Sequence, residues 1–210
     1  MPKSPDPESE MPVMELGIPG IQLSRGDHVC AFWRGTAELD ALLLPWVVEG
    51  LEAGDRCFCV VDDGPEGLQD ALSGRTLLDL EQCVADGQLE IRRAVDVYLE
   101  GGAFSASRVD AWLRSLLGEL TGGQTRPVRS AGVMRWIEEY PPGIDELYAY
   151  ERGLNRLLPS YDFIGICFYD LAHVTGDLVM RVLETHPKVL MGGMLFDNPY
   201  YSAPQGEAEG

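Results

Sequence analysis

The sequence predicts an α/β fold in which a mostly parallel sheet is covered by helices on both faces. Short apolar runs, bounded by glycine, proline or aspartate and often rich in β-branched or aromatic residues, have the pattern of buried strands. Amphipathic segments of helical length separate these runs. This alternation of strands and helices favours right-handed crossovers between parallel strands.

The apolar runs predict six core strands. They are HVCAFW (28–33), RCFCVVDD (56–63), LEIRRA (89–94), SAGVMRWIEE (130–139), DFIGICFYDL (162–171) and KVLMGGMLF (188–196). Ligands of such sheets bind at the carboxyl ends of the strands. The turns FWRG, VDDGPEG, WIEEYPPG and YDLAHVTG, which follow four of the runs, are therefore where we expect a binding site.

The segment 36–53 has apolar residues at helical spacing, with Thr36 as the expected N-cap and Gly54 ending the helix. Pro45 lies inside this pattern and predicts a kink, because proline cannot donate to the carbonyl of Ala41. Five more helices are predicted, within 65–74, 78–87, 107–123, 143–160 and 175–187.

Length and composition predict one domain with short tails. A chain of 210 residues supports one full core, so we expect a single domain over 17–202, with disordered tails at 1–16 and 203–210. A net charge of −18 would repel nucleic acid and anionic bilayers, and neither is expected as a direct partner. No apolar run approaches the roughly 20 residues of a membrane span, and no signal peptide is evident, so we expect a cytosolic protein.

Histidine and cysteine gather in the stretch GDHVCAFWRG. His28 and Cys30 are two residues apart on a predicted strand, so their side chains face the same side of the sheet. Cys57 and Cys59 repeat this spacing on the next strand, and two such pairs could supply the ligands of a zinc ion. The usual zinc spacing is absent, however, and the five cysteines of the chain are more simply read as buried thiols.

The stretch GDHVCAFWRG and the turn after it do not favour nucleotide hydrolysis or nucleophilic catalysis. The turn FWRGTAELDAL lacks the glycines and lysine of a phosphate-binding loop, and Glu38 and Asp40 occupy the first turn of the helix, where a phosphate would bind. Arg34 is the one local cation that could meet an acidic ligand. A Cys–His pair could form a nucleophile, but no orienting group or oxyanion hole is evident. We therefore expect no catalytic residues, no cofactor and no enzyme.

Six stretches, in order over about 26–201, resemble the MEDS family of sensory domains, named for methanogens, methylotrophs and the regulator DcmR. They are HVCAFW, LLLPWVVEGLEAGDRCFCVVDD, YERGLNRLL, CFYDL, THPKVLMGG and NPYY. The resemblance implies a RecA/KaiC-like fold without a phosphate-binding loop, and a non-catalytic sensor of small hydrocarbon derivatives. Family members commonly carry a glutamate in a GEM-x-W stretch, whereas this chain has Val133 there and keeps Trp136.

The leading hypothesis is a sensor whose pocket, at the carboxyl ends of the strands, binds a small apolar or mildly polar molecule. The expected ligand contacts are His28, Cys30, Trp33, Arg34, Trp136, Tyr169 and His186. His186 and the segment DNPYY (197–201) are expected to shift between bound and free states. The signal would pass to a partner such as a histidine kinase or transcription regulator, or through a homodimer.

Two alternatives remain open from the sequence. The first is a metal- or redox-sensing protein that uses His28 and Cys30, with Cys57 and Cys59 as possible further ligands. The second is a protein-interaction module that binds no small molecule, which would require a sealed core without a cavity under His28.

Overall fold

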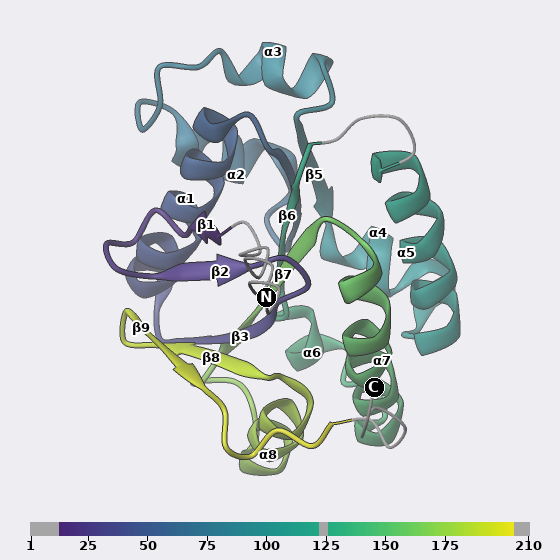
Figure 1. Cartoon of the computed structure of the whole chain (residues 1–210). Coiled ribbons are helices and arrows are strands. Elements are labelled where there is room, and N and C mark those ends of the chain that lie inside the picture. The colour runs from purple at the N-terminus through teal and green to yellow at the C-terminus, as the bar shows by residue number, and fades with distance from the viewer. Residues whose placement is uncertain (1–12, 122–125, 204–210) are drawn as a thin grey trace, which may run out of the picture.

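A computed structural model describes residues 13–121 and 126–203, and its α/β architecture confirms the predicted class (Figure 1). One sheet has the order β5-β4-β6-β7-β3-β8-β9, and its strands are parallel except for the last pair. Its strands are β3 (His28–Trp33), β4 (Arg56–Val61), β5 (Leu89–Arg93), β6 (Val128–Val133), β7 (Phe163–Asp170), β8 (Lys188–Met191) and β9 (Met194–Asp197). A separate antiparallel pair joins β1 (Val13–Glu15), in the expected tail, to β2 (Gln22–Ser24).

Helices cover both faces of the sheet, as Figure 1 shows. One face packs against α1 (Thr36–Ala53), α2 (Gly64–Leu72) and α3 (Leu80–Ala85). The other packs against α4 (Ala94–Tyr98), α5 (Ala106–Thr121), α6 (Trp136–Glu139), α7 (Ile144–Leu157) and α8 (Gly176–Thr185), with 3-10 turns at Glu100–Gly102 and Leu158–Ser160. Within the described residues, no helix combines the length and apolar character that a membrane span requires.

The predicted bounds of two strands were wrong. The run 130–139 was predicted to be one strand, but β6 ends at Val133 and α6 follows over Trp136–Glu139. The run 188–196 was also predicted to be one strand, but it folds into the β8–β9 hairpin. Its turn is formed by Gly192 and Gly193, both with positive φ, a conformation that glycine adopts without strain.

The start of α1 also differs from the expected cap. Gly35 is the N-cap, with φ of 71° and no side-chain capping bond, and Thr36 is the first helical residue. The Glu38 carboxylate instead accepts a hydrogen bond from the backbone N–H of Arg34, at 2.8 Å. The helix continues past Pro45 and ends at Gly54, whose left-handed conformation matches the predicted stop.

A buried arginine connects β6 to the elements on the α1 side of the sheet. Arg129 donates from Nε to Asp55 Oδ2 at 2.6 Å and from Nη1 to the carbonyl of Glu15, at the end of β1. Its guanidinium also lies 4.6 Å from the ring centre of Trp46. Gly50 leaves the space for this side chain, because a Cβ there would lie 2.6 Å from Arg129 Cδ.

We expect Asp55→Ala to lower the free energy of unfolding by about 3–5 kcal/mol, because it leaves a buried guanidinium without its counter-charge. Urea denaturation followed by circular dichroism measures this change. Asp110→Ala is the control, since Asp110 pairs with Arg114 on the surface of α5 and such pairs contribute at most about 1 kcal/mol. Equal losses in the two variants would contradict the assigned role of Asp55.

Candidate functional site

Four side chains of types that can bind a metal ion meet in the core between the sheet, α7 and α8. They are His28, Glu151, Cys167 and His186, and their candidate ligand atoms all lie within 4.8 Å of one another. Glu151 Oε2 lies 3.3 Å from His28 Nε2 and 3.5 Å from His186 Nε2. Cys167 Sγ lies 3.6 Å from His28 Nε2. All four residues are buried, and in the described part of the chain no other group of three or more such residues gathers in this way.

The sequence positions these groups through ordinary local geometry. His28 begins β3 and is paired with Gly165 of β7, so Cys167, two residues further along β7, lies on the same face of the sheet. Glu151 lies between Leu147 and Leu154 on the buried face of α7, at helical spacing. His186 directly follows the last residue of α8, where the chain leaves the helix in an extended conformation before a proline.

Hydrogen bonds fix the orientation of both imidazole rings. The amide of Asn155 donates to the carbonyl of Thr185 at 2.6 Å, so its oxygen faces His28 Nδ1 and accepts a hydrogen bond from it at 3.1 Å. His186 Nδ1 donates to the carbonyl of Val182 at 2.8 Å. Both Nδ1 atoms therefore carry protons, and both Nε2 atoms face Glu151.

Burial and charge set the protonation of the cluster. Burial opposes ionisation of Glu151, but the nearby rings of His28 and His186 outweigh it and lower the pKa of the carboxyl group. Burial, followed by the charge of His28, lowers the pKa of His186 to about 3. Burial, followed by the charge of Glu151, raises the pKa of Cys167 well above its usual value. At neutral pH the cluster thus holds a carboxylate, a neutral His186 and a thiol.

One oxygen of Glu151 accepts a hydrogen bond, and the other only faces the two imidazole rings. The hydroxyl of Tyr169 donates to Oε1 at 2.6 Å. Oε2 makes no hydrogen bond, and neither does Nε2 of His186, although both atoms are buried and 3.5 Å apart. Such unpaired buried polar atoms are unusual in folded proteins and call for a physical explanation.

Two of the predicted contact residues, His28 and His186, belong to this cluster, and a third, Tyr169, packs against it. The rings of His28 and His186 lie 4.0 Å apart, and Tyr169 packs edge-on against His186. Cys30 lies beside Cys167 in the β3–β7 register, but its thiol points to the carbonyl of Lys188 at 3.7 Å. Sequence reasoning missed Glu151, Asn155 and Cys167 as functional candidates. The signal for two of them was present in YERGLNRLL, where polar residues occupy the apolar face of a helix.

The remaining predicted contacts lie elsewhere. Trp33 is five residues beyond His28, so strand alternation places it on the opposite face of the sheet, against α1. Arg34 is exposed, and Trp136 stacks between Tyr98 and Phe104, with ring centres 4.9 and 5.3 Å away. The expectation that His28 lies at the carboxyl edge was wrong, because it is the first residue of β3.

The structure excludes the four-ligand zinc arrangement that the sequence left as part of an alternative. Cys57 and Cys59 face the α1 side of the sheet, whereas Cys30 and His28 face the α7 side. The sheet itself therefore separates the two pairs, and one ion cannot contact both.

An apolar cavity of about 40 Å³ borders His28 and Cys167, between the sheet and helices α5 and α7. Its other lining residues include Val60, Trp112 and Leu154. Two wider clefts lie at the carboxyl edge of the sheet, with volumes of about 100 and 260 Å³. Asp62, Asp63 and Arg135 line both of these clefts, so this edge is polar and charged.

The fold and this site define an α/β domain with a buried polar cluster beside a small apolar cavity. The profile of one family, described as "MEthanogen/methylotroph, DcmR Sensory domain", matches residues 27–187. The chain belongs to this family, MEDS, and is a sensory domain, as the resemblance predicted. It is also similar to the transcriptional repressor DcmR of Methylorubrum extorquens, with 25% identity over 182 residues, which is 86% of this chain and 65% of the repressor. The chain thus spans slightly less than two thirds of that relative.

We expect Asp62→Asn to stabilise the protein only at higher pH. Burial raises the pKa of Asp62 to about 6, against the opposing charge of Arg135, so the folded state binds this proton more tightly than the unfolded chain. The contribution of Asp62 to the stability of the natural protein should therefore fall as the pH rises from about 4 to 6, a loss that asparagine avoids. Urea denaturation of both proteins across this range tests the prediction, and a constant difference between them would contradict it.

Proposed function

We propose that this domain detects a small, weakly polar molecule in the apolar cavity beside His28 and Cys167, and passes the signal to a regulatory partner. The cavity itself carries the proposal. It borders two members of the buried cluster, and a ligand-free interaction module would have a sealed core at this point. Membership of a sensory family supports the same role.

The size of the cavity restricts the ligand. One water molecule needs about 10–15 Å³ of such space, so 40 Å³ accommodates roughly three heavy atoms. Benzene occupies cavities of about 150 Å³ and is therefore too large. The ligand class that fits is a one- to three-carbon compound, in agreement with the small hydrocarbon derivatives that the family resemblance implies.

The lining gives this ligand an apolar surface with a few polar groups. Phe58, Val60 and Leu113 belong to the apolar part, while His28 and Ser130 supply polar atoms. Ligand pockets commonly combine apolar walls with a small number of polar groups that fix orientation. A halogenated or hydroxylated hydrocarbon suits this lining better than a charged metabolite.

His186 connects His28, at the edge of the cavity, to the surface through a ring contact and a hydrogen bond. Its ring lies against His28, and its backbone carbonyl accepts a hydrogen bond from Asn198 at 2.7 Å. Asn198 also donates to the carbonyl of Leu183 in α8, at 2.6 Å, and thus ties the segment 197–201 to that helix. A ligand that shifts the two rings can therefore alter the surface formed by α8 and this segment, provided that it binds the two arrangements with different affinity.

Xenon binding tests the cavity directly. We expect saturable shifts of the methyl resonances of Leu113 and Leu154 in NMR spectra of the natural protein under xenon, and none with benzene. Val60→Leu fills the cavity and should weaken xenon binding at least tenfold.

The matched control is Val61→Leu, which adds the same methylene group on the opposite face, beside the 100 Å³ cleft. This variant should bind xenon at these methyl groups as the natural protein does. Equal affinity in the two variants, or the absence of saturable shifts, would rule out the cavity as the ligand site.

A further inference from the structure

We propose that His28, Glu151, Cys167 and His186 together bind one zinc ion at a buried tetrahedral site. This inference does not rest on the proposed ligand, because it concerns the cluster and not the cavity beside it. The sequence predicted no metal ligands, apart from the alternative based on His28 and Cys30, with Cys57 and Cys59 as possible further ligands. In the structure, Cys167 occupies the position in the cluster that this alternative gave to Cys30.

Three of the six separations between the four ligand atoms match tetrahedral zinc, and all six are within 4.8 Å. Zinc–nitrogen and zinc–oxygen bonds of about 2.0–2.1 Å, with tetrahedral angles, place such atoms about 3.3 Å apart, and a zinc–sulfur bond of about 2.3 Å gives about 3.6 Å between nitrogen and sulfur. The observed distances are 3.3 and 3.5 Å from Glu151 Oε2 to the two Nε2 atoms. The distance between His28 Nε2 and Cys167 Sγ is 3.6 Å.

The polar atoms that lack partners are those that a metal ion would bind. Glu151 Oε2 and His186 Nε2 make no hydrogen bond, and both point into the centre of the cluster. A zinc ion between them would satisfy both atoms at once. This explains two of the buried polar atoms that the protein itself leaves unpaired.

Charge also balances at this site. Zinc carries two positive charges, and the Glu151 carboxylate and Cys167 thiolate supply two negative ones, so the buried complex is neutral. On binding, the sulfur–hydrogen bond of Cys167 breaks, a zinc–sulfur bond forms, and the proton leaves to solvent. No oxidant or reductant is needed.

The surrounding hydrogen bonds already orient the ligands as metal sites require. Metal-binding histidines usually donate their second N–H to a carbonyl or carboxylate, and here Nδ1 of each ring donates to an oxygen. The second oxygen of Glu151 is held by Tyr169. Tyr169 is thus a positioning residue, and Tyr169→Phe should weaken zinc binding about 10–100-fold.

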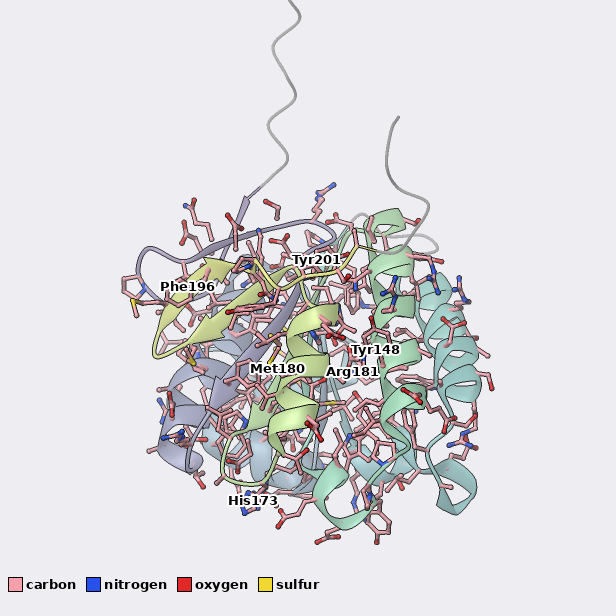
Figure 2. The ribbon with its side chains drawn as sticks, turned by 90° about the horizontal axis from the view of Figure 1, so that it is seen from below. Tyr148, His173, Met180, Arg181, Phe196 and Tyr201 are labelled. Atoms are coloured by element: carbon pink, nitrogen blue, oxygen red, sulfur yellow. The ribbon has the colours of Figure 1, made fainter. Side chains whose placement is uncertain are left out.

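A narrow cleft between α7 and α8 leads from the surface to this cluster. Glu151, Val182 and Thr185 line its inner end, and its volume is only about 10 Å³. Figure 2 shows Tyr148 and Arg181 side by side at the outer end, where the guanidinium lies 5.1 Å from the ring centre.

Metal analysis of the full chain, purified without a metal-affinity tag from zinc-supplemented cells, is the first test. We expect about one zinc ion per chain by mass spectrometry. Refolding the metal-free protein with cobalt(II) should produce the visible absorption of tetrahedral cobalt, together with a thiolate-to-cobalt charge-transfer band in the near ultraviolet. The charge-transfer band reports Cys167 even if substitutions at this position impair folding.

Two cysteine substitutions form a matched pair. Cys167 and Cys30 are neighbours in register on adjacent strands, and both are buried and reduced. Cys167→Ser should abolish the charge-transfer band and reduce zinc content at least tenfold. Cys30→Ser should leave both unchanged.

Several results would overturn the proposal. These are the absence of zinc and of the cobalt spectrum, stoichiometric iron or copper in place of zinc, and loss of metal from Cys30→Ser but not from Cys167→Ser. Because xenon binding is measured separately, failure of the zinc site and failure of the ligand cavity are distinguishable.

Discussion

The carboxylate of Glu151 is buried where α7, α8 and the centre of the sheet meet. A buried charge costs several kcal/mol unless neighbouring groups compensate for it, so its surroundings restrict the whole region. Tyr169 from β7 donates to one oxygen, and the rings of His28 and His186 face the other. These partners come from separate segments of the chain. The Glu151 carboxylate therefore helps to fix the positions of α7 and of the turn after α8 relative to the sheet.

This constraint also connects the interior to the surface. Asn155, one turn beyond Glu151 on α7, joins the His28 ring to the end of α8 through the carbonyl of Thr185. Asn198 then joins the same end of α8 to the chain after β9. A change at the cluster, caused by a metal ion or by a molecule in the adjoining cavity, therefore has a short hydrogen-bonded route to an exposed face. A sensory domain needs a route of this kind, because the bound state must differ at a surface that a partner can contact.

Strand and helix patterning was enough to predict the α/β class, and the ordered motifs predicted the MEDS family. The site was predicted only in part. His28 and His186 were identified as chemically unusual residues, but their meeting depends on β3 lying between β7 and β8, which no local pattern reveals. The same limit explains why Cys30 was preferred to Cys167: the two cysteines are in register, and only the positions of Glu151 and the His28 ring distinguish them. The prediction that Trp33 contacts the same ligand as His28 was wrong for a simpler reason. Strand alternation alone places the two side chains on opposite faces of the sheet.

Both histidines present Nε2 to Glu151 because their Nδ1 atoms are held by fixed acceptors. Long-range proton–nitrogen NMR of protein labelled with ¹⁵N-histidine tests this arrangement most directly, and the more exposed His173 supplies an internal reference. We predict a proton on Nδ1 of both His28 and His186, with and without zinc. A ring with bare Nδ1 and a proton on Nε2, in either residue, would contradict this prediction, since that tautomer directs an N–H group at the position of the proposed zinc ion.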